Sequence, residues 1–258
     1  MPEGDNVHYA ARSLNQALGG RLLTGCDVRV PAYATVDLTG EVVDEVVARG
    51  KHLLMRVGTV TVHSHLKMEG TWQVYRPGEK WRRPAWQARI ILSTADHVAV
   101  GFQLGLLEVI PRDEEHTVVG HLGPDPLGPD WDAEEALNRM LADPDRPIGL
   151  ALLDQRVIAG LGNVYRAEVC FLRGILPTRP AGDVSNPDKL VDLAHRLINA
   201  NRDRATRTTT GKLRGDTYWV YGRGGKPCLR CGTTIIRGEL GDSELTLRTT
   251  FHCPVCQT

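Results

Sequence analysis

The 258-residue sequence contains no apolar run near the ~20 residues that a membrane-spanning helix needs. Its N-terminus also lacks the basic stretch followed by an apolar stretch that marks a secretory signal. These absences predict a cytoplasmic protein with no membrane partner. The sequence has no net charge either, because 31 Lys and Arg balance 31 Asp and Glu. Overall charge therefore does not single out nucleic acid as the partner.

The charges are nevertheless distributed unevenly along the chain. Acidic residues dominate in residues 113–145, whereas residues 202–237 contain nine lysines and arginines against Asp203 and Asp216. A basic stripe can hold phosphates on a neutral protein, because the local field matters more than the net charge. The distribution therefore keeps nucleic-acid binding open.

Four of the six cysteines form two Cys-x2-Cys pairs, which are Cys228 with Cys231 and Cys253 with Cys256. Four thiolates in two such pairs are typical of a tetrahedral zinc site in a cytosolic protein. The 21 residues between the pairs are enough for a β-hairpin. Because four protein ligands leave no open coordination position, we expect the zinc to be structural. The remaining cysteines, Cys26 and Cys170, have apolar surroundings and are expected to be buried thiols.

The chain begins Met1-Pro2-Glu3-Gly4. If Met1 is removed, Pro2 presents a secondary amine beside the carboxylate of Glu3, which is a nucleophile next to an acid/base group. The alternative is that Met-Pro reflects N-terminal processing alone. Helical spacing of apolar residues follows up to Leu18, with Asp5 or Asn6 as the expected cap. The positive end of that helix would help to keep a nearby amine neutral.

Period-two alternation from Arg21 to about Ile110 predicts many short strands and hence a β-sandwich or barrel. The expected strands are Leu22–Val30, Val42–Ala48, His52–Val57, Thr59–His65, Thr71–Tyr75, Ala88–Leu92, His97–Phe102 and Leu106–Ile110. Lys51 falls in a turn, where it is either solvated or delivered to the mouth of a site. His63 and His65 face one side of a strand and could bind a metal, but the lack of a third ligand favours structural or surface roles.

The second half of the sequence is expected to be helical up to about residue 205. The expected helices are Ala133–Ala142, Pro147–Gln155, Asn163–Leu172 and Pro187–Asn201. Gly160 and Gly162 permit tight turns before Asn163, which we expect to cap the third helix. Helix N-terminal amides next to such turns can form a phosphate cradle, although a packing role is an equal alternative.

The order of these parts resembles the formamidopyrimidine-DNA glycosylase and endonuclease VIII family, over essentially the whole chain. The most specific segments are Met1–Gly4, Gly50–Leu54, His121–Asp125, Leu152–Glu168, Trp219–Cys231 and Arg248–Gln257. Two features are typical of the endonuclease VIII branch. Gly4 follows Glu3, and Arg166 lies three residues after Asn163. The resemblance implies an α+β multidomain fold, with an N-terminal β-sandwich and helix, then a helix–two-turn–helix domain ending in a four-cysteine zinc-finger β-hairpin.

The expected domains are a catalytic sandwich at residues 1–112, a hinge at 113–132, the helix–two-turn–helix domain at 133–215 and the zinc finger at 216–258. The resemblance also implies three catalytic residues. Pro2 corresponds to the amine that displaces the damaged base, Glu3 to the acid/base group, and Lys51 to the essential turn lysine that contacts phosphate.

DNA-binding residues follow from the same resemblance. Asn163 and Arg248 correspond to residues that grip the phosphates flanking the lesion, and Arg166 is expected to join the DNA-binding set. In the loop 66–70, Met68 is the candidate wedge that fills the space left by a flipped nucleotide, although it could instead pack in the core. The implied ligands of one structural Zn²⁺ are the four paired cysteines.

The implied activity is that of a bifunctional DNA glycosylase and abasic-site lyase of base excision repair. It would remove oxidised bases, pyrimidines in particular, through a Pro2 Schiff base and cut the strand by β,δ-elimination. The expected partner is damaged double-stranded DNA, with single-stranded or bubble DNA as an alternative substrate, and the expected state is a monomer.

Two positions depart from the family pattern, because Asp5 replaces a common proline and Asn6 replaces a common second glutamate. Base recognition is therefore open, whereas the Pro2 chemistry is not affected. The loop 102–107 also lacks the Arg-Phe pair with which the glycosylase branch probes the opposite strand. Two alternatives remain, namely a zinc-finger protein that binds damaged DNA without cutting it, and a lyase with little glycosylase activity.

Overall fold

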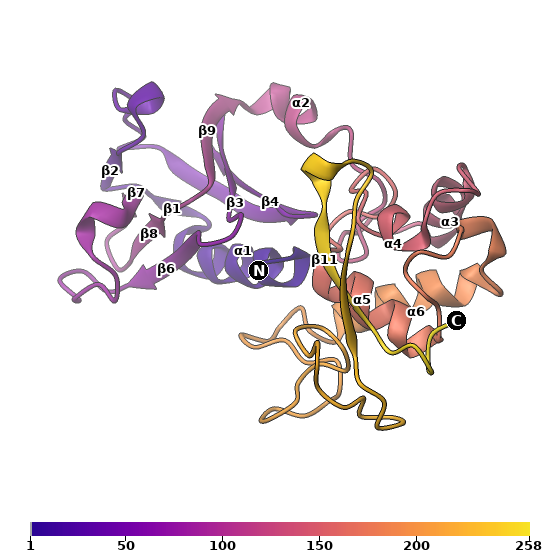
Figure 1. Cartoon of the computed structure of the whole chain (residues 1–258). Coiled ribbons are helices and arrows are strands. Elements are labelled where there is room, and N and C mark those ends of the chain that lie inside the picture. Colours follow the sequence, from indigo (N-terminus) through magenta and orange to yellow (C-terminus); the bar gives the residue numbers. More distant parts are fainter. Residues whose placement is uncertain (1) are drawn as a thin grey trace. The chain divides into compact units, whose positions relative to one another are not determined.

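The computed structural model describes residues 2–258 and forms two compact units, of which the first ends at His121 and the second spans Leu122–Thr258 (Figure 1). Met1 lies outside the described residues. In the first unit the elements are α1 (Gly4–Leu18), β1 (Arg21–Leu22), β2 (Gly25–Val28), η1 (Pro31–Tyr33), β3 (Val42–Arg49), β4 (His52–Val57), β5 (Val60–His65), β6 (Thr71–Tyr75), η2 (Ala85–Gln87), β7 (Ala88–Ser93), β8 (Val98–Phe102), β9 (Leu106–Pro111), η3 (Arg112–Glu114) and α2 (Glu115–Val119).

The first unit is a sandwich of two antiparallel sheets, as the period-two pattern predicts. One sheet has the strand order β1-β3-β4-β5-β9, and the other has the order β2-β7-β8-β6. Alternate residues of β4, such as Leu53 and Met55, are fully buried in the main core together with Val62 of β5. The intervening residues, which include His52, lie on the opposite face of the sheet, because successive side chains of a strand alternate.

The strand expected over Leu22–Val30 is wrong as a single element, because it is divided between the two sheets. The amide of Leu23 donates to Glu41 O, next to β3, whereas the amide of Thr24 donates to Ser93 O of β7. The chain therefore changes sheets between these two residues. Leu23 is fully buried, and the change of hydrogen-bonding partner occurs at Thr24, directly before Gly25.

Helix α1 packs on the sheet and runs antiparallel to β3. The side chain of Asn15 accepts a hydrogen bond from the amide of Val46 over 2.8 Å, and Gly20 donates to Val43 O over 2.7 Å. Later residues of α1 thus lie beside earlier residues of β3. The direction matters for the site, because it decides which end of β3 lies beside the start of the helix.

The second unit is helical and ends in a hairpin. Its elements are α3 (Ala133–Leu141), α4 (Ile148–Ala151), α5 (Asn163–Arg173), η4 (Ala181–Asp183), α6 (Pro187–Asn199), β10 (Ile236–Leu240), η5 (Glu244–Thr246) and β11 (Arg248–His252). A core between α3, α4, α5 and α6 includes Tyr165 and Val169, and a second cluster joins Phe171 of α5 to Phe251 of β11. Nine of the eleven residues of α5 are buried, so this helix is the centre of the unit.

The helix expected over Pro147–Gln155 is wrong in length, because α4 ends at Ala151. The carboxylate of Asp154 accepts from the amide of Arg156 over 2.9 Å, which turns the chain after the helix. Among residues 2–258, the structure contains no helix that is long and apolar enough to cross a bilayer.

Candidate functional site

Glu3, and not Asp5 or Asn6, caps α1. The helix begins at Gly4, and Glu3 and Asn6 form a reciprocal capping box in which the amide of Glu3 donates to Asn6 Oδ1 over 3.3 Å. The expected cap was wrong because the helix begins at Gly4, before Asp5 and Asn6. The Glu3 side chain accepts from the amide of Asn6, as a shorter N-cap side chain would. Glu3 is fully buried, and its carboxylate is thereby held at the helix start, directly after Pro2.

The antiparallel packing of α1 on β3 brings Glu3 and Lys51 to the same end of the first unit. From Asn15 back to Glu3 the helix rises ~18 Å. From Val46 forward to Arg49 the strand advances ~10 Å in the same direction, and the turn that bears Lys51 follows directly. Because Asn15 and Val46 are hydrogen-bonded to each other, the two predicted catalytic residues lie on the same side of that bond, toward the start of α1 and the end of β3.

Lys51 occupies a two-residue turn between β3 and β4. Arg49 pairs with His52, so Gly50 and Lys51 alone connect the strands. Gly50 has a φ of +57°, which the first central residue of a tight hairpin turn of this hand requires and which other residues rarely adopt. The glycine therefore fixes the turn, and Lys51 is half-buried on it.

Two histidines and a glutamate form a hydrogen-bonded chain on the sheet face next to this turn. His52 Nδ1 lies 2.8 Å from His63 Nε2, and His63 Nδ1 lies 3.0 Å from Glu108 Oε2. A carboxylate only accepts, so His63 Nδ1 donates to it, and in a neutral His63 ring the Nε2 atom then accepts from His52 Nδ1. His63 is 1% exposed, and the chain satisfies both of its ring nitrogens.

His52 and His65, which lie near Lys51, have pKa values well below the ordinary value for histidine. Burial lowers the pKa of His52 to about 3, with further contributions from the nearby rings of His63, His65 and His121 and from Lys51. Burial likewise lowers the pKa of His65 to about 4, helped by the positive charge of Lys51. His65 Nδ1 also accepts from the amide of Lys67 over 2.9 Å.

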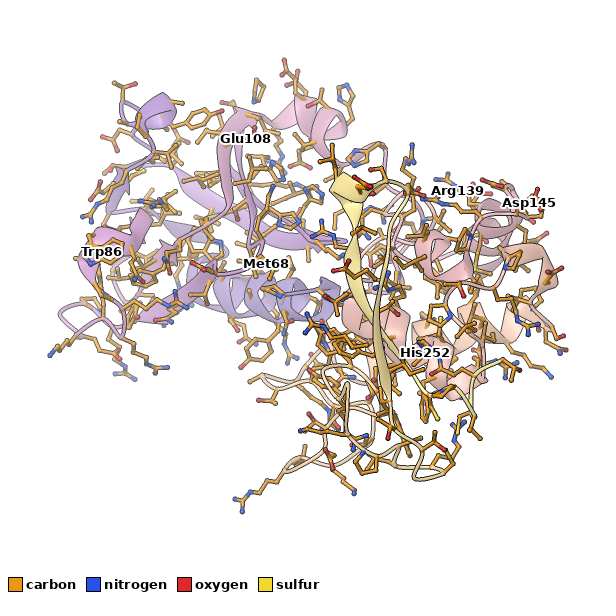
Figure 2. All side chains as sticks on the ribbon, in the orientation of Figure 1. Met68, Trp86, Glu108, Arg139, Asp145 and His252 are labelled. Atoms are coloured by element: carbon orange, nitrogen blue, oxygen red, sulfur yellow. The ribbon has the colours of Figure 1, made fainter. Side chains whose placement is uncertain are left out.

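Met68 lies on a tight exposed turn. The amide of Gly70 donates to Leu66 O over 2.9 Å, and a Cβ on Gly70 would lie 2.4 Å from that oxygen. Lys67 has a φ of +54°, and Met68 is 66% exposed (Figure 2). A wedge needs such an exposed apolar side chain, whereas a core methionine would be buried.

The start of α5 is joined to β11 at one backbone carbonyl. Asn163 Nδ2 donates to Thr249 O over 2.8 Å, and Arg166 Nη2 donates to the same oxygen over 2.9 Å and also to Asn163 Oδ1. The expectation that Asn163 caps the helix is wrong, because Gly162 is the N-cap and the Asn163 side chain binds β11. Arg166 is fully buried, so a contact between Arg166 and DNA stays a prediction.

Arg248 is the first residue of β11 and pairs with Leu240 across the hairpin. Its side chain is exposed, and Thr249, its neighbour, is the residue that Asn163 and Arg166 hold. The structure thus brings Asn163, Arg166 and Arg248 into one part of the second unit.

Glu168 is a structural residue that the sequence did not single out. It is fully buried on α5, and its carboxylate accepts from the amides of Trp219, Val220 and Tyr221 and from the hydroxyl of Thr209. Burial raises the pKa of Glu168, and the donated hydrogen bonds oppose that rise. A charged residue on the apolar face of a helix was the available signal, since such residues are rarely buried without partners.

Gln155 is a second such residue, and it fixes the glycine turn before α5. Its Oε1 accepts from the amide of Gly160 over 2.9 Å, and its Nε2 donates to Leu161 O over 2.8 Å. Gly160 has a φ of +88°, as the tight turn requires. No local pattern marks Gln155 in the sequence as the residue that binds this turn, because tertiary packing brings the turn next to it.

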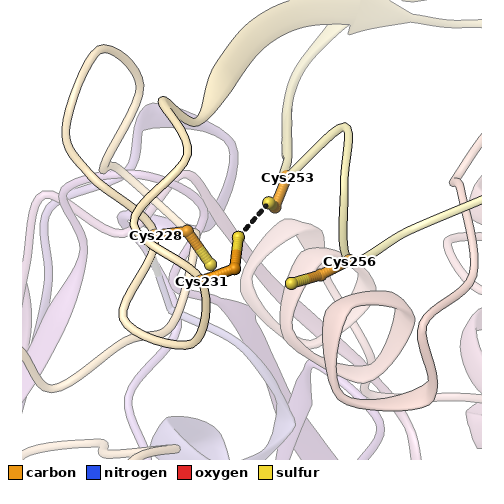
Figure 3. A group of neighbouring side chains, drawn as sticks. All are labelled: Cys228, Cys231, Cys253 and Cys256. Atoms are coloured by element: carbon orange, nitrogen blue, oxygen red, sulfur yellow. Dashed lines mark hydrogen bonds between the residues drawn. The ribbon is translucent and has the colours of Figure 1, made fainter.

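The four paired cysteines converge in the second unit (Figure 3). Their Sγ atoms all lie within 4.8 Å of one another, and those of Cys231 and Cys253 are 3.5 Å apart. Among residues 2–258 this is the only cluster of three or more potential metal ligands, so His63 and His65 belong to none.

This donor set fits a tetrahedral zinc ion. Zn–S bonds of about 2.3 Å place thiolates roughly 3.8 Å apart, which is close to the observed spacing. Burial raises the pKa of Cys256 to about 12, with the neighbouring thiols adding to the effect. A cation at the centre would offset the cost of placing four thiolates together. Cys170, in contrast, is an isolated buried thiol, whose pKa burial raises to about 12.

Each of the two units matches a known family of domains. Residues 1–104 match the model of the formamidopyrimidine-DNA glycosylase N-terminal domain, and residues 122–213 match the formamidopyrimidine-DNA glycosylase H2TH domain. Among solved structures, MutM in complex with DNA containing carbocyclic 8-oxo-G aligns over 100% of both chains with a TM-score of 0.82. At 24% identity, that likeness concerns the fold.

Curated relatives are more similar in sequence. A protein of Streptomyces coelicolor named probable endonuclease 8 2 is 55% identical over 100% of this chain and 94% of its own length. A protein of Mycolicibacterium smegmatis named DNA-(apurinic or apyrimidinic site) lyase Nei2 is 53% identical over 100% of this chain and 99% of its own. Endonuclease 8 1 of Mycobacterium tuberculosis is 36% identical over the full length of both chains.

Proposed function

The chain belongs to the formamidopyrimidine-DNA glycosylase and endonuclease VIII family, in its endonuclease VIII branch, and on that basis we propose that Pro2 is its nucleophile. The protein is a DNA glycosylase and abasic-site lyase of base excision repair, and its partner is damaged DNA. The relatives are bacterial, so we place the reaction on chromosomal DNA in the cytoplasm. Oxidised pyrimidines are the proposed lesions.

The first step replaces one C1′ bond by another. The damaged nucleotide is flipped out of the helix, and the Pro2 nitrogen attacks C1′ while the C1′–N bond to the base breaks and the base leaves with a proton. Glu3 protonates the ring oxygen as the deoxyribose opens. Because Pro2 is a secondary amine, the product is a cationic iminium, which is a strong electron sink.

The later steps cut the strand. The iminium acidifies the C2′ hydrogen, and loss of that proton expels the 3′ phosphate by β-elimination. A second, δ, elimination expels the 5′ phosphate, and hydrolysis of the iminium returns the amine. Glu3 is the proposed proton carrier, and Lys51 contacts the phosphate. Protonated imidazoles at His52 and His65 would repel the ammonium group of Lys51. Because the pKa values of both histidines are lowered, their rings are neutral and Lys51 is the cation at this place.

The observation that carries this proposal is the location of Glu3. Its carboxylate is buried at the start of α1, one residue from Pro2, and the antiparallel packing on β3 brings Lys51 to the same end. The residues proposed as nucleophile, proton carrier and cation thus all belong to the first unit.

The second unit supplies the proposed grip on DNA. Asn163 and Arg248 would bind the phosphates that flank the lesion, and buried Arg166 would support Asn163 through its hydrogen bond to Oδ1. Met68, an exposed residue of the first unit, would fill the space left by the flipped nucleotide. We assign Zn²⁺ to the four cysteines, where it would supply no chemistry but would hold residues 216–258 folded.

A lyase with little glycosylase activity is the second candidate. Asp5 is 1% exposed, and Asn6 is engaged by the amide of Glu3, so both positions that depart from the family pattern serve the start of α1. Base recognition would then have to come from other residues.

Borohydride trapping tests the proposal. Protein lacking Met1 is mixed with a duplex that carries an abasic site and is reduced; a covalent adduct is expected, and protein that keeps Met1 should give none. Absence of an adduct with the processed protein would contradict the nucleophile assignment. Trapping on oxidised-pyrimidine duplexes then separates a full glycosylase from a lyase.

A further inference from the structure

The connection between β6 and β7 is basic and rich in tryptophan. Residues 76–87 contain Arg76, Lys80, Arg82 and Arg83 against the single acid Glu79. They also contain Trp81 and Trp86, which are two of the five tryptophans of the chain. This concentration of positive charge stands out in a protein whose net charge is zero.

Trp81 anchors the connection. Its ring lies 5.7 Å from that of Phe102 in an edge-to-face arrangement and 6.5 Å from that of Tyr75. The amide of Arg82 donates to the Tyr75 hydroxyl over 3.1 Å. The middle of the connection is therefore packed against the small core of Tyr75, Ala88, Val100 and Phe102.

Trp86 is presented to solvent by a rigid turn. It lies in η2 and is 72% exposed (Figure 2). Arg29 Nη1 donates to Ala85 O over 3.0 Å, and the amide of Gln87 donates to Pro84 O over 3.0 Å. Hydrogen bonds to backbone carbonyls on the N-terminal side of Trp86 thus fix the turn that exposes the indole, and this pre-organisation reduces the entropy cost of binding.

The basic connection continues to the turn that bears Met68. Arg83 Nη1 donates to Gln103 Oε1 over 2.7 Å and to Glu69 O over 3.4 Å. The amide of Gln103 in turn donates to Gln87 O over 2.9 Å. A ladder of hydrogen bonds therefore links the proposed wedge to the base of η2 within the first unit.

From this geometry we propose that Trp86 and the exposed cations Arg76, Lys80 and Arg82 bind single-stranded DNA next to the lesion, an inference that rests on the proposed function. An exposed indole can stack on an unpaired base, and the three cations neutralise its phosphates. Paired bases offer no face to the indole inside a duplex, so the surface favours an unpaired strand. The continuity with Glu69 and Gln103 favours DNA over an acidic protein.

Equilibrium binding to two abasic-analogue DNAs tests the inference. One is a blunt duplex with a tetrahydrofuran site, and the other carries in addition a single-stranded tail of about 12 nucleotides, on the 3′ or the 5′ side, which lies within the span of one single-strand site. Wild-type protein should bind one tailed DNA more tightly. W86A should reduce that advantage by about 5- to 100-fold, because base stacking on an aromatic ring has that magnitude.

Matched variants complete the experiment. W86F keeps an aromatic face and should retain most of the advantage, and L22A, at another exposed apolar residue of the same unit, should retain all of it. Changing Arg76, Lys80 and Arg82 together to glutamine should reduce the salt slope for tailed DNA by about 2, since each single-strand phosphate contributes about 0.7.

The outcomes separate the two proposals. A tail advantage that is equal in wild type and W86A, or absent in wild type, would overturn the role of Trp86. A wild-type protein that fails to form a borohydride adduct on an abasic duplex would contradict the proposed function and not the surface. If W86A binds an acidic protein more weakly than wild type does, but binds tailed DNA equally well, the surface binds a protein partner and the inference is refuted.

Discussion

The side-chain amide of Asn163 donates to the backbone carbonyl of Thr249 over 2.8 Å. This bond joins the first residue of α5 to the residue after Arg248, although the two are far apart in the sequence. Arg166 donates to the same oxygen, so the proposed phosphate-binding residues are held together within the second unit without DNA. These side chains therefore lose less conformational entropy when the protein binds DNA.

Asn163→Ala should therefore weaken binding to tetrahydrofuran duplex by about 10-fold, because one hydrogen bond to the hairpin and one proposed phosphate contact are lost. It should also speed amide hydrogen exchange at the hairpin residues around Thr249, which loss of a phosphate contact alone would not do. Asn138→Ala, at an exposed residue of α3, is the control. Unchanged exchange in Asn163→Ala would show that the Thr249 bond does not hold the hairpin.

Glu168→Gln should destabilise the second unit by about 2–3 kcal/mol, because the new amide group would face backbone donors that a carboxylate satisfies. Urea denaturation measures the free energy of unfolding. Glu134→Gln, at an exposed residue of α3, should change it little. Equal effects of the two substitutions would refute the buried role of Glu168.

The stability of the first unit should fall as the pH is lowered from 7 to 5. The folded-state pKa values of His52 and His65 lie at about 3 and about 4, below the ordinary value of 6.5. The unfolded chain therefore binds protons first, and stability is lost below pH 6.5 until the folded pKa values are reached. The loss should be about 2 kcal/mol by pH 5, after halving for solvent screening of these half-buried rings.

Replacing His52 and His65 together by glutamine should flatten this dependence, as measured by urea denaturation at several pH values. His116→Gln on α2, where the side chain is exposed, should leave it unchanged. A wild-type free energy of unfolding that is constant between pH 7 and 5 would contradict the depressed pKa values.

Purified protein should contain one zinc per chain, and Cys253→Ser should lose it. The segment 216–258 has a small core around Phe251 and Ile235, so metal loss should unfold it and abolish DNA binding while α1 and the sandwich stay folded. Metal analysis and binding assays measure these effects. Cys26→Ala should retain both zinc and binding, and DNA binding by the metal-free protein would refute the structural role.

Much of the fold follows from local patterns. The strands from Val42 to Ile110 and the helices α3, α5 and α6 are predicted by the period of their apolar residues, because this period is a local property of the chain. The division of the first expected strand between two sheets was not predictable. The side-chain pattern of a segment does not record which strand each half of it pairs with.

The candidate site divides in the same way. Residue type and spacing by themselves suggested an amine beside a carboxylate at Pro2 and Glu3 and a metal site at the four cysteines, and the family resemblance added the catalytic roles of Pro2, Glu3 and Lys51, which stay predictions. Only the tertiary structure decided that Glu3 caps α1, that Asn163 and Arg166 hold Thr249, that Glu168 satisfies the amides of the finger, and that Trp86 is exposed. The physical reason is that a hydrogen-bond partner or a burial state belongs to a pair of segments brought together by packing, and no local pattern encodes which pair that is.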